Sequence, residues 1–233
     1  MDKTLEENRK EIIELLNSKA ALKQDIFQKI QEAYSLLRKV LTDEVNTLHS
    51  QITDQRIRMF LKDECDSEIK AFVGSDCLIF HMHTNVFQLP EDNPLWETDY
   101  MKEDPSRGYF GIIYIYNFLA DSILQNRLGD PGYLIERIFV NKENRFFVEG
   151  HSGMISEFSS IDKDQLDDKK MRYIIQTAMD YVINFDLLTP PFKMLAQINV
   201  QQADAIANAN SIKIQTGKRL GFRYEKEGND IQD

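Results

Sequence analysis

The chain has 233 residues, 42% of them hydrophobic, and a formal net charge of −10 with a pI near 5.0. This excess of acidic groups repels polyanions, so the composition argues against non-specific binding to nucleic acid or to an anionic membrane. The length suits one large domain, or one ordinary domain with an extension. With 14 Phe, 9 Tyr and 8 Met, the chain has ample material for a packed core.

The cysteine content and the chain start indicate a cytoplasmic protein. Cys65 and Cys77 are the only cysteines, and we interpret both as free thiols in a reducing compartment. Residues 1–4 lack the basic and then apolar layout of a secretory signal. No stretch approaches the roughly eighteen apolar residues that a membrane helix needs, so we expect no membrane partner.

The first residues predict a long helix. No glycine precedes Gly74 and no proline precedes Pro90, so nothing interrupts a helix from residue 4 to about residue 62. Thr4 and Glu7 have the spacing of a capping box, which marks a helix start. We therefore divide the chain into a helical segment, 1–66, an α+β domain, 67–226, and a polar tail, 227–233.

The apolar residues of this helix recur in steps of three and four and form a stripe that must be covered. Its most regular members are Ile30, Ala33, Leu37, Leu41, Val45, Leu48 and Ile52. We favour a coiled-coil-like homodimer through residues 4–62. One alternative is an antiparallel helical hairpin that reverses at Asn17-Ser18 or Thr42-Asp43, where polar side chains could cap a second helix. Another is that the second half of the helix lies on the following domain.

After the boundary at residues 63–67 the pattern changes to short β-prone runs. Residues 69–73 and 77–87 flank the turn Gly74-Ser75-Asp76 and predict a β-hairpin. The next segment, 89–107, contains three prolines and several acids and reads as a long surface loop. Residues 109–116 predict a buried strand, and Asn117 could cap a helix over 118–127.

The remaining elements follow in order. A second hairpin is predicted from 133–140 and 145–149, a loop over 150–160, and a helix over 164–185 whose core side begins at Met171. The expectation is completed by a strand at 194–200, a short helix or loop at 201–210, and closing strand material at Ile212, Ile214 and 220–224. Hairpins outnumber crossover units, so the fold class predicted is α+β: a long N-terminal helix followed by a mostly antiparallel sheet covered by helices.

His81-Met82-His83 is the candidate metal site. Alternate residues of a strand point the same way, so both imidazoles could reach one metal ion. Further ligands would have to come from Glu91, Asp92 or Asp99 in the long loop, or from His151. The alternative is that both histidines are ordinary polar groups on a half-exposed strand.

Three weaker motifs favour structural readings. Glu68-Ile69-Lys70 resembles a fragment of metal-dependent nucleases, but three-residue matches are common by chance. Cys77 is four strand residues from His81, about 13 Å, which is too far for a thiol–imidazole hydrogen bond. The glycines of residues 217–221 lack phosphate-loop spacing and suit a turn.

Aromatic residues concentrate in the middle of the chain, as in Tyr109, Phe110, Tyr114, Tyr116 and Phe118. They could simply be core, or they could line a site for a flat ligand in which Arg107, Arg137 or Arg145 fixes an anionic group. The leading hypothesis is a helix-dimerised, non-catalytic module that binds a small molecule or a protein. The competing hypothesis is a metal-dependent enzyme centred on His81 and His83. The sequence names no cofactor.

Overall fold

The computed structural model describes residues 4–150, 158, 160–161 and 165–185. It is an α+β fold in which a long N-terminal helix precedes a seven-stranded antiparallel sheet. This is the predicted fold class.

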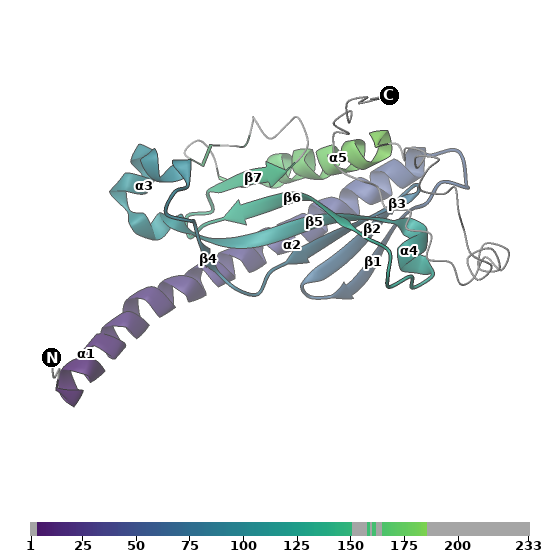
Figure 1. The fold of residues 1–233 in the computed structure, drawn as a ribbon. Helices are drawn as coiled ribbons and strands as arrows, with labels where there is room; N and C mark the ends of the chain where they lie inside the picture. The colour runs from purple at the N-terminus through teal and green to yellow at the C-terminus, as the bar shows by residue number, and fades with distance from the viewer. Residues whose placement is uncertain (1–3, 151–157, 159, 162–164, 186–233) are drawn as a thin grey trace, which may run out of the picture.

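The N-terminal helix is one continuous rod of three parts, α1 (Leu5–Leu15), a π-helical turn η1 (Leu16–Ala20) and α2 (Ala21–Gln51), and its first part projects beyond the sheet (Figure 1). The capping box forms, since the Glu7 amide donates to Thr4 Oγ1 at 3.3 Å and the Thr4 amide to Glu7 Oε2 at 2.8 Å. The rod does not reverse at residues 17–18 or 42–43, so the helical hairpin is excluded.

The expected end of this helix near residue 62 is wrong. The helix ends at Gln51, and β1 (Met59–Cys65) follows as an edge strand. Between them the carboxylate of Asp54 accepts the Arg56 amide at 2.9 Å, a local turn that competes with helix. Phe60 then stacks on Phe72 of the neighbouring strand, with ring centroids 4.5 Å apart, which favours strand pairing.

The main strands are paired antiparallel in the order β1-β2-β3-β5-β6-β7, and a short β4 pairs with the start of β5. Their bounds are β2 Glu68–Val73, β3 Asp76–Met82, β4 Phe87–Gln88, β5 Tyr109–Leu119, β6 Tyr133–Val140 and β7 Phe146–Gly150. Both predicted hairpins form, but the second strand of the first hairpin ends at Met82 and does not continue to residue 87. Gly74 turns the first with φ +61°, a conformation that side chains with a Cβ disfavour.

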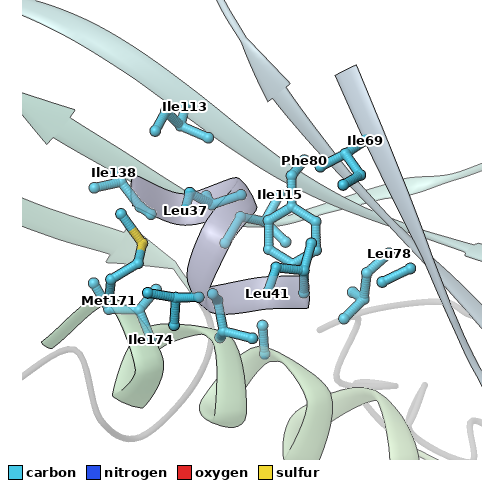
Figure 2. Packing of buried hydrophobic residues seen from close by; sticks show 14 of the residues in the cluster. Leu37, Leu41, Ile69, Leu78, Phe80, Ile113, Ile115, Ile138, Met171 and Ile174 are labelled. Atoms are coloured by element: carbon cyan, nitrogen blue, oxygen red, sulfur yellow. The ribbon is translucent and has the colours of Figure 1, made fainter. Parts of the chain in front are cut away.

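Two helices, α2 and α5 (Asp168–Asn184), cover one face of the sheet and form the main core with it (Figures 1 and 2). The strands alternate, so every second residue points into this core. Residues fully buried there include Leu37 and Leu41 of α2, with Phe80 and Ile115 of the sheet. Burying one such side chain stabilises the fold by about 1.5–3 kcal/mol.

This packing decides what covers the predicted helical stripe. From Ile26 to Val45 the stripe is buried, mostly against the chain's own sheet and α5, which was the last of the three packings considered. By contrast, all residues from Thr4 to Lys19 are exposed. The homodimer through residues 4–62 therefore stays a prediction, and only the projecting part of the helix is left to make it.

Two loop and helix expectations are corrected. The segment 89–107 is not an irregular loop: it holds two 3₁₀ turns, η2 (Pro94–Glu97) and η3 (Pro105–Gly108), around α3 (Asp99–Glu103). Prolines at the first helical positions are compatible with these turns. Met101 is fully buried beneath them.

The helix expected at 118–127 is shortened to α4 (Ala120–Leu124). Asn117 does not cap it. Asn117 is buried within β5, where its amide nitrogen donates to Asp76 at 3.0 Å, and Phe118 continues the pairing with β3. The β-pairing of an already formed sheet outweighs the local capping preference.

Part of the prediction falls on residues that are not described. The expected elements at 194–200, 201–210 and 220–224, the tail 227–233, and His151 all lie outside the described residues. Among the helices that are described, none combines the length and apolar character needed to cross a bilayer.

Candidate functional site

The candidate site lies on the open face, the sheet face opposite α2 and α5. Its centre is a row of five cross-strand neighbours, one from each of β2, β3, β5, β6 and β7. We call this the central row: Glu68, His81, Tyr114, Arg137 and Glu149, each paired in register with the next. In antiparallel pairs, directly opposed residues bring their side chains within reach of one another.

Apolar clusters cover the open face on both sides of the central row. On one side, the segment of α3 and its 3₁₀ turns packs Leu89 and Met101 onto Phe110 and Phe139. On the other, Ala120 of α4 packs with Phe72, Cys77 and Ile79. Between the two clusters, the side chains of the central row are only partly buried, so they remain accessible.

Charged groups in and beside the central row are paired. Lys70 Nζ lies 3.3 Å from a carboxylate oxygen of Glu68 and 3.3 Å from one of Glu64, and His81 Nδ1 lies 3.7 Å from Glu68 Oε2. Burial lowers the pKa of Lys70, but its two carboxylate partners outweigh burial and the net shift is upward. At the other end, Arg137 forms an ion pair with Glu149.

Aromatic side chains lie at and beside the middle position of the central row. Tyr114 and Tyr116 are near parallel, at 22°, with centroids 5.8 Å apart. The His83 ring meets Tyr114 edge-on at 6.0 Å. Burial and the neighbouring Tyr114 raise the pKa of Tyr116, so its hydroxyl stays protonated and can donate a hydrogen bond at neutral pH.

The two candidate metal ligands come close to the same tyrosine. His81 pairs in register with Tyr114, and His83 follows just after the end of β3. The Nδ1 atom of His83 accepts the Asn85 amide at 2.9 Å, which leaves Nε2 as the N–H of a neutral ring. Within the described residues, no three side chains of His, Cys, Asp or Glu gather as a metal site. Metal binding at His81 and His83 stays a prediction.

The surroundings of the two cysteines and of the Glu68-Ile69-Lys70 motif favour structural roles for these residues. Cys77 is fully buried, and burial raises its pKa to about 12, so its thiol is protonated at neutral pH. Cys65 is exposed, and its Sγ lies 3.5 Å from Ser67 Oγ. Glu68 and Lys70 share the open face but form an ion pair with each other.

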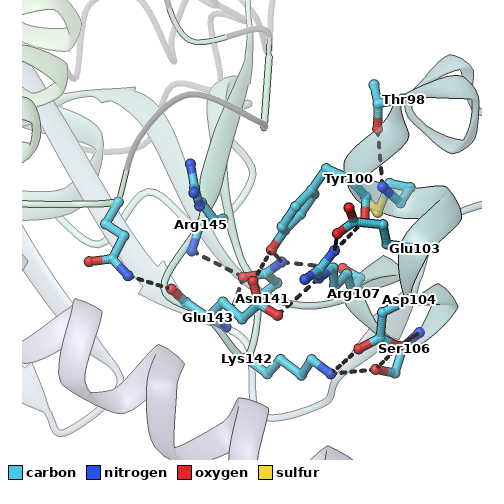
Figure 3. A network of polar contacts seen from close by, with 12 residues as sticks. Thr98, Tyr100, Glu103, Asp104, Ser106, Arg107, Asn141, Lys142, Glu143 and Arg145 are labelled. Carbon is cyan, nitrogen blue, oxygen red and sulfur yellow. Dashed lines mark hydrogen bonds and ion pairs between the residues drawn. The ribbon is translucent and has the colours of Figure 1, made fainter.

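Only one of the three candidate arginines lies in the central row. Arg107 and Arg145 instead belong to a polar network between the α3 segment and the β6–β7 turn (Figure 3). There the Arg107 guanidinium donates to Glu143 at 2.9 Å and lies 4.3 Å above the Tyr100 ring, while Arg145 lies 5.6 Å from that ring. Arg137 is thus the arginine available to a ligand on the open face.

Asn141 is the centre of this network and was not singled out in the sequence. It is fully buried, its Nδ2 donates to the Tyr100 hydroxyl at 2.8 Å, and its Oδ1 accepts the amides of Glu143 and Arg145 at 3.0 Å each. In the sequence, the run Asn141-Lys142-Glu143-Asn144 between the two strands of the second predicted hairpin indicated only a turn. A nearby cleft of about 490 Å³ between α2 and this turn is lined by Lys29, Glu32, Lys142 and Glu143, among others. These charged groups are already paired with protein side chains.

Comparison with known proteins adds no further constraint. No family model matches this chain, and no match was found among curated proteins or solved structures.

Proposed function

We propose that this chain is a non-catalytic binding module that dimerises through its N-terminal helix and takes a flat aromatic ligand with an acidic group on the open face of its sheet. The observation that carries the proposal is the central row, in which accessible aromatic and charged side chains meet between two apolar clusters. A site of this kind combines apolar contact with a few polar groups that fix orientation.

The tyrosine pair supplies the apolar contact. Tyr114 and Tyr116 are stacked on each other on one face of the sheet, so a planar ligand ring can extend this stack or pack against the ring edges. Aromatic pairs contribute about 0.5–1.5 kcal/mol beyond the area that they bury. A protein that presents an aromatic side chain beside a carboxylate would offer the same chemistry.

Arg137 supplies the charge. It pairs in register with Tyr114, and its guanidinium has the geometry for two parallel hydrogen bonds to a carboxylate or sulfonate. Its present partner is Glu149, and the two side chains are 38% and 39% exposed. Ion pairs this exposed contribute about 0–1 kcal/mol, so a ligand acid can replace Glu149 at small cost.

The test is a fluorescence titration with 1-anilinonaphthalene-8-sulfonate, an aromatic anion with a planar naphthalene ring. We expect one probe per chain, with binding weakened about tenfold or more by Tyr114→Ala, which amounts to about 1.4 kcal/mol. Arg137→Gln should weaken binding most at low ionic strength, because salt screens exposed charges.

The matched control is the double variant Ile12→Ser with Leu16→Ser on the projecting helix. It removes two exposed apolar side chains that do not belong to the sheet. This control should leave the high-affinity probe site unchanged. Equal probe affinity in wild type and Tyr114→Ala would refute the open face as the site.

The second candidate function, a metal-dependent enzyme, rests on the approach of His81 and His83 to the same tyrosine. Elemental analysis of the purified chain tests it. Stoichiometric metal that is lost in His81→Ala with His83→Ala would favour this candidate, and metal-free wild-type protein would remove it.

A further inference from the structure

The projecting helix is an apolar surface with no cover in the described structure. From Thr4 to Lys19, which we call the arm, every residue is exposed, and Leu5 is 84% exposed. The other large apolar side chains of the arm, 51–59% exposed, are Ile12, Ile13, Leu15 and Leu16. At 1.5 Å per residue the arm is about 24 Å long.

The π-helical turn makes this surface distinct from the face that α2 buries. Counted on a regular helix, Leu5, Ile12 and Leu16 would continue the buried stripe of α2. The π-turn Leu16–Ala20 adds one residue to a turn, which rotates the arm by about 100° relative to α2. The apolar stripe of the arm is thereby turned away from the side on which α2 meets the sheet.

An uncovered apolar stripe of this length favours a partner. The arm is continuous with α2, so its helix does not have to nucleate alone, but most helical stability in proteins comes from covering an apolar face. The arm nevertheless has a complete capping box at Thr4 and Glu7, so its sequence specifies a helix to its very start.

We infer that the arms of two copies of this chain pair with each other in antiparallel orientation. The inference rests on the dimer of the proposed function and gives it a surface and a direction. Charge decides the direction. Acidic Glu6 and Glu7 lie in the first turn, whereas Lys19 and Lys23 lie at the base of the arm.

Antiparallel pairing brings the acidic end of one arm against the basic base of the other, while parallel pairing would oppose like charges at both ends. In one antiparallel register Ile12 lies opposite Leu15 of the second copy, and Leu5 lies opposite Leu22, the partly exposed second residue of α2.

This register also sets one polar layer, with Asn8 opposite Lys19. Polar residues within an apolar seam fix register and orientation at some cost in stability. The Lys19 ammonium lies 5.9 Å from the Tyr109 ring centroid, so the base of the arm is also where the sheet begins. The paired region therefore extends as far as the start of the domain.

The first experiment measures mass in solution by sedimentation equilibrium on the full chain. We expect wild type to be a dimer, and Ile12→Glu with Leu16→Glu to be a monomer. Both positions are exposed, so the variant should keep the circular dichroism and unfolding midpoint of a folded domain measured at a dilution where wild type is also monomeric. A monomeric wild type, or a dimer indifferent to this variant, overturns the proposal.

The second experiment reads orientation. In a Cys65→Ser background, Asn8→Cys and Lys19→Cys proteins are oxidised separately and as a mixture. Antiparallel arms give a covalent dimer mainly in the mixture. Parallel arms give covalent dimers in each separate protein and overturn the proposed direction.

Charge reversal provides the matched control. Lys19→Glu with Lys23→Glu should weaken the antiparallel dimer, and the further change Glu6→Lys should restore it in part. Failure of restoration counts against antiparallel pairing. These variants should all retain the sulfonate probe site, so loss of the dimer and loss of the open-face site are separate outcomes.

Discussion

Gly111 shows how closely α2 approaches the sheet. A Cβ built at this position of β5 would lie 2.5 Å from the Ile30 Cβ, which no flexible side-chain end can relieve. Gly111→Ala should therefore push α2 from the sheet and lower the free energy of unfolding by about 1–3 kcal/mol. Urea denaturation of wild type and variant measures this change in the free energy of unfolding. The control is Leu128→Ala, whose side chain is 89% exposed and whose loss should change stability by less than about 0.5 kcal/mol.

Asn141 is a second position where one side chain holds several groups. Asn141→Ala leaves two turn amides without their acceptor and the Tyr100 hydroxyl without its donor, so we expect a loss of about 2–4 kcal/mol in unfolding free energy. Tyr100→Phe removes only the hydroxyl contacts and should cost about 0.5–1.5 kcal/mol. Thermal unfolding of both variants gives the comparison, and an equal loss would contradict the central role of Asn141.

At the scale of elements, the sequence predicted what local pattern encodes. The capping box and the stripe of the long helix, the core side of α5 and both hairpins follow from residues close together in the chain. The strand β1 was missed because its polar residues carry no alternation strong enough to end a helix prediction. Its pairing with β2, fixed partly by the Phe60–Phe72 stack, is a tertiary effect.

The candidate site was predictable only in part. Tyr114, Tyr116 and Arg137 were singled out as an aromatic cluster with an arginine, but so were Arg107 and Arg145, which lie elsewhere. What selects Arg137 is the register of β5 against β6, and a slip of one residue would send it to the other face. Register across strands separated by loops is not readable from one sequence.

The packing of α2 on α5 includes one buried charge, which makes a prediction at this scale. Glu44 is 5% exposed and accepts hydrogen bonds from Arg172 and Gln176, both at 2.7 Å. Glu44→Ala should lower the unfolding free energy by about 1–3 kcal/mol, because hydrogen bonds to a charged group contribute more than neutral ones.

The matched control for Glu44 is its neighbour Asp43. Its carboxylate lies 3.9 Å from Arg172 and is 52% exposed, so Asp43→Ala should change stability by less than about 0.5 kcal/mol. Guanidinium denaturation of the two alanine variants distinguishes the loss of the buried Glu44 hydrogen bonds from a general effect of removing negative charge.

Across the whole molecule, ion pairs join segments far apart in sequence. Lys142 of the β6–β7 turn lies 2.5 Å from a carboxylate oxygen of Asp104, next to α3, and Lys39 of α2 lies 3.1 Å from Asp168 of α5. Hydrogen bonds from Lys142 and Ser106 hold the pKa of Asp104 well below its usual range. Lys39 similarly lowers the pKa of Asp168.

These lowered pKa values set the direction of the acid response. A carboxyl whose pKa is lower in the folded chain than in the unfolded chain stabilises the fold at pH values above its unfolded pKa, about 4. That stability is lost as the pH falls through the folded pKa. We therefore expect the unfolding midpoint temperature to fall steadily as the pH decreases from about 5 to about 2.

Lys142→Met tests the largest of these contributions, because it removes the first cause of the low Asp104 pKa. Since Asp104 is 37% exposed, the pair is partly screened, and we expect a loss of at most about 1 kcal/mol at neutral pH. The informative result is how this difference in stability changes with pH. It should shrink as the pH falls from about 5 to about 2, because Asp104 of the unfolded chain takes up a proton over this range and its low folded-state pKa then stabilises the wild type less. Lys169→Met, which changes an exposed lysine of α5, should leave this pH dependence unchanged. A constant difference across the whole pH range would mean that Lys142 acts by packing rather than by charge.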